Sequence, residues 1–106
     1  MNVIELREYQ IKPGKTAQWL NLMEKEILPY QRSKGVDVIN SYLYCDDNGD
    51  EWFVWLRQFK DEQSRQEICS QLYDQWWINE VRPKVFSLIE ESSVKVRTLQ
   101  AAFSAN

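Results

Sequence analysis

The stretch VIELREYQIKPGK, residues 3–15, decides the fold because it predicts a strand with one charged face, followed by a tight turn. Successive side chains of a strand point to opposite sides, so Glu5, Arg7 and Tyr9 share one face. Such a face is too charged for an ordinary core and too regular for a loop. Proline fixes φ and glycine is free to adopt a positive φ, so the final Lys-Pro-Gly-Lys predicts the turn.

The next segment, residues 16–35, predicts a helix that packs on a sheet. Trp19, Met23 and Ile27 recur at four-residue spacing and form an apolar stripe along one side of it. Pro29 falls inside this helix and has no amide hydrogen to donate. We therefore expect a kink or a distorted turn just before it.

A β-hairpin is predicted to follow the helix. Residues 36–45 and 51–59 are rich in β-branched and aromatic side chains, and five turn-forming residues, DDNGD, separate them. The second strand is apolar on both faces, which a sheet with one solvent-exposed face would not require. One face carries Trp52, Val54 and Leu56, and the other carries Phe53, Trp55, Arg57 and Phe59.

Two helical segments and a last strand complete the chain. Asp61 and Asp74 are the expected N-caps of the helical segments, and alternating residues at 94–99 predict the strand. The order β-α-β-β-α-β is the ferredoxin-like motif, an α+β fold in which helices cover one face of a four-stranded antiparallel sheet. At 106 residues the chain predicts one domain, residues 1–99, with a C-terminal tail at 100–106.

The aromatic side of this sheet predicts a homodimer. The apolar stripes of the helices suffice for one face of the sheet, so we expect the face with Tyr9, Phe53 and Trp55 to remain uncovered in one chain. An exposed aromatic face of this size marks an association surface. A second copy of the chain is therefore expected to cover it, closing two sheets into a dimeric α/β barrel.

Composition narrows the range of functions. The net charge is -3 and the basic residues are scattered, so we expect no nucleic-acid partner. No segment approaches the ~18 uncharged apolar residues that span a membrane, and we expect a cytoplasmic protein. The chain has no histidine, which excludes Ser-His and Cys-His nucleophile pairs, histidine-ligated haem iron and nearly all zinc sites. No metal or cofactor is expected.

Several short motifs resemble, in their order and spacing, those of the NIPSNAP family. They are ELR-x-Y at 5–9, PGK at 13–15, LP at 28–29, VWLRQF at 54–59, a tryptophan at 76 or 77, and VRP at 81–83. The resemblance spans nearly the whole domain and implies a dimeric α+β barrel, but no defined activity. The wider barrel superfamily includes cofactor-independent monooxygenases and haem-degrading enzymes. Because the chain lacks the histidine of the latter, the resemblance does not extend to haem degradation.

The charged face of the sheet is the candidate ligand-binding site. Its expected members are Glu5, Arg7, Tyr9, Phe53, Trp55, Arg57 and Arg97. Arginines hold carboxylates or phosphates and aromatic rings stack on planar groups, so a small anionic or aromatic metabolite is the expected ligand. Alternatively, Glu5 pairs with the arginines only to neutralise charge inside a dimer interface.

Three classes of function stay open at this point. The first is a dimeric small-molecule-binding protein. The second is a cofactor-independent oxygenase or isomerase with Glu5 as the catalytic base, which would need a raised pKa. Neighbouring arginines lower the pKa of a carboxyl group, and this opposition favours binding over catalysis. The third is an interaction module in which the dimer itself is the function.

Overall fold

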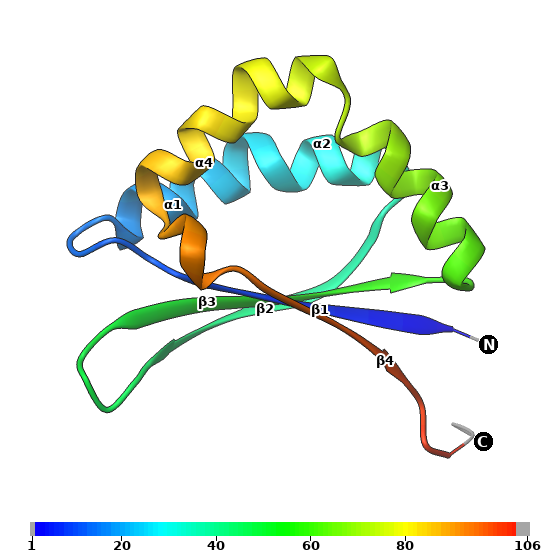
Figure 1. The fold of residues 1–106 in the computed structure, drawn as a ribbon, viewed down its shortest axis with the longest axis horizontal. Coiled ribbons are helices and arrows are strands. Elements are labelled where there is room, and N and C mark those ends of the chain that lie inside the picture. Colours follow the sequence, from blue (N-terminus) through cyan, green and yellow to red (C-terminus); the bar gives the residue numbers. More distant parts are fainter. Residues whose placement is uncertain (1, 104–106) are drawn as a thin grey trace.

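The structure, a computed structural model, describes residues 2–103 and has the ferredoxin-like α+β fold that the sequence predicts (Figure 1). Its strands are β1 (Val3–Gln10), β2 (Asp37–Cys45), β3 (Glu51–Phe59) and β4 (Lys95–Gln100). They form one four-stranded antiparallel sheet in the order β2-β3-β1-β4. The predicted boundary between domain and tail stays a prediction, because part of the tail lies outside the described residues.

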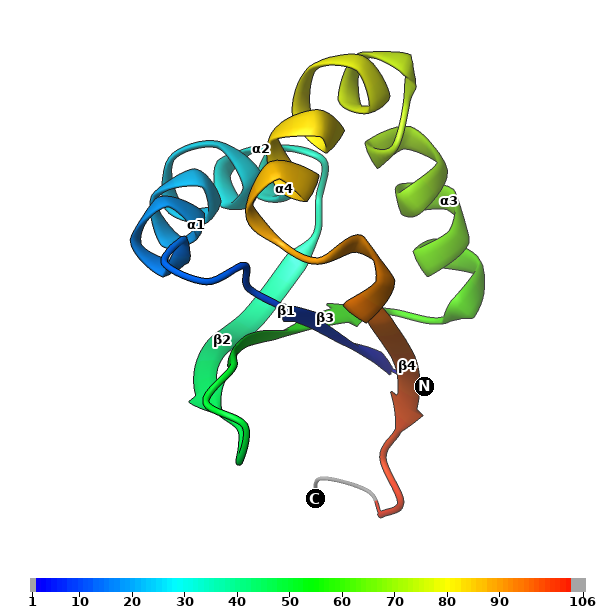
Figure 2. The ribbon, with the colours of Figure 1, turned by 60° about the vertical axis from the view of Figure 1, so that its left-hand side comes forward.

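The helices of the described residues all lie on one face of the sheet (Figures 1 and 2). The first helical segment comprises α1 (Thr16–Leu22), the π-helical turn η1 (Met23–Ile27) and α2 (Leu28–Ser33). The second comprises α3 (Glu62–Leu72), the π-helical turn η2 (Trp77–Val81), α4 (Arg82–Leu88) and the short 3-10 turn η3 (Glu91–Ser93). The hairpin, the broken second segment and the last strand thus occur in the predicted order.

The distortion expected before Pro29 is confirmed, and it takes the form of a π-helical turn. Proline cannot donate to the carbonyl four residues earlier, so the regular α-helical ladder is interrupted there. The chain widens into η1 just before Leu28 and Pro29. Arg82 and Pro83 follow η2 in the same way. π-helical turns often occur at functional sites. The region where η1 and η2 face the sheet is therefore a candidate functional site.

The expected N-caps are also in place. Asp61 Oδ1 accepts a hydrogen bond of 2.7 Å from the Ser64 backbone amide, at the start of α3. Asp74 Oδ1 accepts one of 2.9 Å from the Trp77 amide, at the start of η2. A side-chain oxygen at this position satisfies an amide that has no partner inside the helix, so each aspartate fixes where its helical turn begins.

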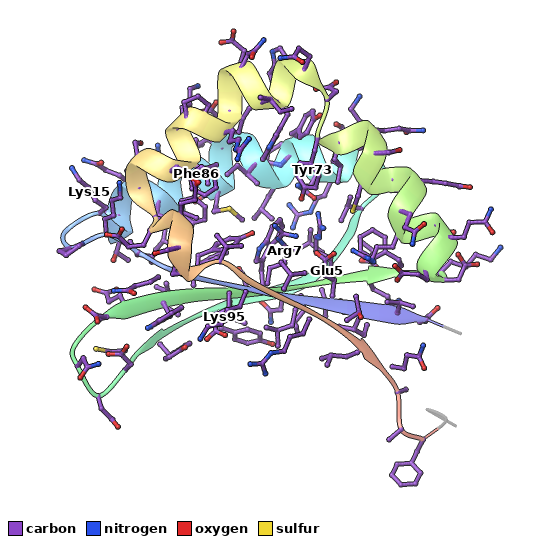
Figure 3. The ribbon with its side chains drawn as sticks, viewed as in Figure 1. Glu5, Arg7, Lys15, Tyr73, Phe86 and Lys95 are labelled. Atoms are coloured by element: carbon purple, nitrogen blue, oxygen red, sulfur yellow. The ribbon has the colours of Figure 1, made fainter. Side chains whose placement is uncertain are left out.

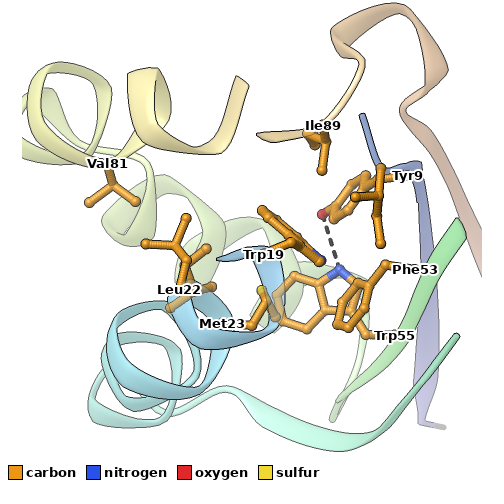
Figure 4. Packing of buried hydrophobic residues seen from close by; sticks show 10 residues of the cluster. Tyr9, Trp19, Leu22, Met23, Phe53, Trp55, Val81 and Ile89 are labelled. Carbon is orange, nitrogen blue, oxygen red and sulfur yellow. Dashed lines mark hydrogen bonds between the residues drawn. The ribbon is translucent and has the colours of Figure 1, made fainter. Parts of the chain in front are cut away.

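The prediction of which face the helices cover is wrong. Tyr9, Phe53 and Trp55 are only 2–6% exposed, because the chain's own helices bury them. Their rings pack with Trp19 of α1, whose ring centroid lies 5.8 Å from that of Tyr9 and 5.6 Å from that of Phe53 (Figure 4). The physical reason is that β3 is apolar on both faces, so alternation alone does not indicate which of them faces the helices. We call this helix-bearing side the covered face.

The opposite side, which we call the open face, has no covering element among the described residues. Its members include Ile4, Leu6, Glu8, Tyr42, Tyr44, Trp52, Val54, Leu56, Lys95, Arg97 and Leu99. Tyr42 is 51% exposed and Leu99 is 42% exposed. Arg97 is in register with Leu6, so its placement in the predicted site is wrong: it lies on the other side of the sheet from Arg7.

Candidate functional site: a cavity between sheet and helices

A cavity of about 310 Å³ lies between the covered face and the helices, at the low end of ligand-pocket volumes. Its walls are largely apolar and aromatic, and they include Trp19, Met23, Ile27, Trp77, Val85 and Phe86. Both π-helical turns contribute to them. Ile78 and Arg82 also line the cavity and are exposed, which places its mouth beside η2 and the start of α4. At about 30 Å³ per water molecule, the volume corresponds to about ten non-hydrogen atoms.

Glu5 is the centre of an ion-pair network on the sheet floor, beside the cavity. Its side chain is 1% exposed, and one of its oxygens, Oε1, accepts from Arg57 Nη2 at 2.5 Å and from Arg7 Nη1 at 3.2 Å. The other oxygen, Oε2, accepts from Arg65 Nη1 at 2.9 Å. Figure 3 shows Glu5 and Arg7 pointing from the sheet toward the helices and Tyr73, whereas Lys95 lies on the open side.

Arg57 is fully engaged in this network. Its Nε and Nη2 donate to Glu5 and its Nη1 donates to Gln31 Oε1 at 2.8 Å and to Tyr73 Oη at 3.1 Å. Its Nη2 also reaches Cys69 Sγ at 3.6 Å. All five N–H donors therefore have partners, and the rings of Trp55 and Phe59 lie beside the guanidinium, with centroids at 5.3 and 5.4 Å. Arg57 is thus held as a structural group with no donor left for a ligand.

The network keeps Glu5 ionised. Burial by itself would raise the pKa of the Glu5 carboxyl, but the charges and hydrogen bonds of Arg57 and Arg7 outweigh it and lower that pKa below its usual value. A carboxylate with a lowered pKa is a weak base near neutral pH. Glu5 also does not line the cavity. Its position is that of an anchor for three arginines.

Arg7 and Tyr9 form the polar part of the cavity that still has free donors, which we call the Arg7–Tyr9 corner. Arg7 Nε donates to Tyr9 Oη at 2.7 Å and Arg7 Nη1 donates to Glu5, but Nη2 has no partner among the described residues. Tyr9 Oη also accepts from Trp55 Nε1 at 3.0 Å, the bond drawn in Figure 4. With both acceptor positions taken, the phenolic proton of Tyr9 is left to donate.

The other polar groups of the lining are donors as well. Gln31 Oε1 is occupied by Arg57, which leaves the amide nitrogen Nε2 for a partner. Tyr73 Oη accepts from Arg57 and keeps its proton. Trp19 Nε1 is the one buried side-chain polar atom without a partner among residues 2–103. The cavity therefore offers hydrogen-bond donors and few acceptors, so a matching ligand must bring the acceptors.

The structure brings some of the predicted site residues to the cavity and leaves others away from it. Arg7, Tyr9 and Trp55 line it. Glu5 and Arg57 lie beside it, fully buried and paired with each other. Phe53 belongs to the apolar core beneath it, and Arg97 lies on the open face.

Sequence reasoning did not place Gln31, Tyr73 or Arg82 at the site. For Gln31 a signal was present, because it continues the four-residue spacing of Trp19, Met23 and Ile27. A polar residue at the next position of a buried stripe indicates a polar partner inside, here Arg57. Tyr73 lies at the end of α3, and Arg82 lies at the junction of η2 and α4. Helical periodicity is interrupted at both places, so it does not indicate where these side chains point.

The described residues show neither a metal site nor a membrane span. No group of three or more Cys, Asp and Glu side chains within residues 2–103 is arranged to hold a metal ion. In the same range, no helix has the length and apolar character required to cross a membrane.

Comparison with known proteins points to one family. Residues 4–105 match the family model described as NIPSNAP. No match was found among the curated proteins.

Solved structures give the same result. A NIPSNAP family protein from Agrobacterium tumefaciens is 27% identical, with a TM-score of 0.78 over 99% of this chain and 98% of that chain. An uncharacterised NIPSNAP-like domain protein from Burkholderia xenovorans is 21% identical, with a TM-score of 0.80 over 99% of this chain and 90% of that chain. A second Agrobacterium tumefaciens NIPSNAP family protein, of unknown function, is 24% identical, with a TM-score of 0.79 over 98% and 92%. The last two show likeness of fold alone.

Proposed function

The chain belongs to the NIPSNAP family, and on this premise we propose that it binds a small molecule with an apolar body and one anionic oxygen group in its cavity. The protein acts as a cytoplasmic homodimer in this proposal. The observation that carries it is the Arg7–Tyr9 corner, where an arginine and a phenol keep unused donors inside a largely apolar and aromatic cavity.

The charge balance around this corner favours an anion. Arg7, Arg57 and Arg65 face the carboxylates of Glu5 and Glu62, so three positive groups meet two negative ones and the cluster carries a net charge of +1. Arg7 is the member that lines the cavity and keeps a free donor. Charge-assisted hydrogen bonds are about twice as strong as neutral ones, and a ligand anion would balance the excess.

The same geometry favours binding over catalysis. The cofactor-independent oxygenase or isomerase considered from the sequence needs a base near the ligand, and Glu5 was the candidate. Its carboxylate is occupied by three guanidinium groups and its pKa is lowered. A base of that kind takes a proton poorly at neutral pH, whereas a preorganised set of donors is already a binding site.

The open face supports the homodimer. Its side chains include Tyr42, Trp52 and Leu56, and large exposed apolar patches on a sheet mark association surfaces. Its charged residues have both signs, with Glu8 beside Lys95 and Arg97 nearby, so two copies can pair opposite charges. After β4 the chain continues on the side of the sheet away from the helices (Figures 1 and 2). Phe103 is 87% exposed. A second copy is the partner that this self-complementary pattern fits.

The proposal is tested with a matched pair of ligands, benzoate and benzamide, which have the same shape and differ in charge. We expect benzoate to bind more tightly to the wild-type protein, measured by quenching of tryptophan fluorescence, because Trp19, Trp55 and Trp77 line the cavity. Arg7→Met should weaken benzoate binding by about tenfold to a hundredfold, the range for a hydrogen bond to a charged group.

The matched control is Arg97→Met, which makes the same substitution at an arginine of the open face. It should leave benzoate binding unchanged. Equal loss in both variants, or equal affinity of the wild type for benzoate and benzamide, would contradict the proposed function.

A further inference from the structure

The Arg7–Tyr9 corner points to a narrower ligand class, and this step rests on the proposed function. We infer that the corner holds a weakly acidic hydroxyl group, a phenol or an enol, as its oxyanion, through one oxygen that accepts from Tyr9 Oη and Arg7 Nη2.

The guanidinium of Arg7 presents a half-occupied edge. Nε and Nη2 lie side by side in a rigid planar fork, and this edge normally binds both oxygens of a carboxylate. Here Tyr9 Oη already takes the Nε position at 2.7 Å. One position remains on that edge, next to Nη2, and a single ligand oxygen fills it. The corner is therefore suited to a one-oxygen anion.

The hydroxyl of Tyr9 completes the pair of donors. It accepts from Arg7 Nε and from Trp55 Nε1, so its proton has no direction left except toward a further acceptor. Burial raises the pKa of Tyr9, with a smaller opposing effect of Arg7, so the phenol stays protonated at neutral pH and remains a donor. A ligand oxygen beside Arg7 Nη2 then receives both an N–H and an O–H hydrogen bond.

A neutral hydroxyl group fits this corner less well than its anion. A phenol or enol brings its own proton and needs an acceptor for it, but both acceptor positions of Tyr9 are taken and Arg57 takes one of the two on Gln31 Oε1. An oxyanion has no proton to place and accepts from both donors. The proton it lost stays in bulk water, since no group of the corner takes it up.

The charged groups around the corner act in the same direction. Arg57 on β3 and Arg65 on α3 bind the Glu5 carboxylate, which would otherwise repel the ligand oxyanion. Arg82 lies at the mouth of the cavity and adds a positive charge. Tyr73 faces the cluster and accepts a hydrogen bond of 3.1 Å from Arg57. Arg7 is the member of this cluster that lines the cavity and has a donor without a partner among the described residues.

The probe for this inference is 4-nitrophenol, whose oxyanion absorbs at longer wavelength than the neutral phenol. It has ten non-hydrogen atoms, about the number that the cavity admits at roughly 30 Å³ per water-sized volume. Excess protein is mixed with the probe at a pH below the pKa of the free phenol. We expect the oxyanion band to grow, corresponding to a lowering of the probe's pKa by about one unit or more, the effect of one adjacent positive charge.

Variants and a second ligand separate the outcomes. Arg7→Met and Tyr9→Phe should each remove most of the band shift, and Arg97→Met should keep it. Circular dichroism checks the fold, and Arg7→Lys, which keeps the charge but loses the planar edge, should give an intermediate shift.

Binding of benzoate without ionisation of 4-nitrophenol would overturn this inference and leave the proposed function standing. Absence of binding by both ligands to the folded wild type would overturn both. An equal band shift in Arg7→Met and the wild type would also overturn the inference, because the oxyanion would then be held elsewhere.

Discussion

The two faces of the sheet differ in a way that is opposite to the usual arrangement. The covered face buries Glu5 and Arg57 completely, and the open face presents Tyr42 and Leu99 to solvent. Beside its aromatic core the covered face holds charges in the interior, and beside its own charged residues the open face presents large apolar groups to solvent. A buried charge costs several kcal/mol unless it is paired, and here each one is paired. In the proposed function, the interior charges hold the Arg7–Tyr9 corner in place and the exterior apolar groups form the homodimer interface.

The largest expected effect comes from breaking the buried pair. Arg57→Met leaves Glu5 without its closest partner and removes the donor to Gln31 and Tyr73. Truncating one member of a buried ion pair costs about 3–5 kcal/mol, so we expect the free energy of unfolding to fall by that amount. Urea unfolding followed by tryptophan fluorescence measures it.

Arg97→Met is the matched control for that loss. It removes the same side chain from an exposed position directly across the β1–β4 pair from Leu6. In a single chain, where Arg97 is exposed, such a substitution changes the free energy of unfolding by about 0.5 kcal/mol or less, so the two variants are compared at protein concentrations at which the chain is monomeric. Similar losses in the two variants would mean that the two faces do not differ as described.

The second effect is on assembly through the open face. Val54→Lys places a charge at the middle of that face, directly opposite Glu8 on β1, which can pair with it in a single chain. In the homodimer this pair would be removed from water, and the two copies of the lysine would bring like charges to one interface. Like charges across an interface cost several kcal/mol, so the dissociation constant should rise by about a hundredfold or more.

Analytical ultracentrifugation over a concentration series measures this constant. The control is Gln18→Lys, which adds the same charge on an exposed position of α1. A wild-type protein that is monomeric at micromolar concentration would contradict the proposed homodimer, whatever the result for the variants.

The third and smallest effect is the response of stability to acid. Because the pKa of Glu5 is lowered in the folded state, its contribution to stability is full above the unfolded value of 4.5 and is lost as the pH falls through the folded pKa. Glu5→Gln should therefore be less stable than the wild type at neutral pH, and the difference should shrink below about pH 4.5.

Glu24→Gln, at an exposed position of η1, serves as the control for the acid response. Hydrogen bonds also lower the pKa of Asp46 and Asp61, so the wild type and both variants share that part of the acid sensitivity. A difference between Glu5→Gln and wild type that stays constant from neutral to acid pH would contradict the ion-pair account.

Much of the fold was predictable from local patterns. Local interactions explain the hairpin at DDNGD, the N-caps Asp61 and Asp74, and the distortion before Pro29, because each depends on residues only a few positions apart in the sequence. Periodicity also gave the element order and the sheet. These signals are strong because turn, cap and proline chemistry does not depend on the rest of the chain.

The site was predictable only in part, because it depends on which face the helices choose. On β3, Phe53 and Trp55 point to one face and Val54 and Leu56 point to the other, and both sets are apolar. The alternation of side chains therefore does not distinguish the two faces, and the covered face was predicted to pack against a second copy of the chain. The same ambiguity placed Arg97 with Arg7. What decides between the faces is the pairing of Glu5 with Arg57 and the fit of Trp19 to the aromatic set, both of which are long-range.

The most direct test of the central claim is a crystal structure of the protein soaked with 4-nitrophenol. The account predicts the ring among the aromatic walls of the cavity and its phenolic oxygen within about 3 Å of both Tyr9 Oη and Arg7 Nη2. A cavity that stays without ligand at saturating probe, or a probe bound on the open face instead, would contradict it.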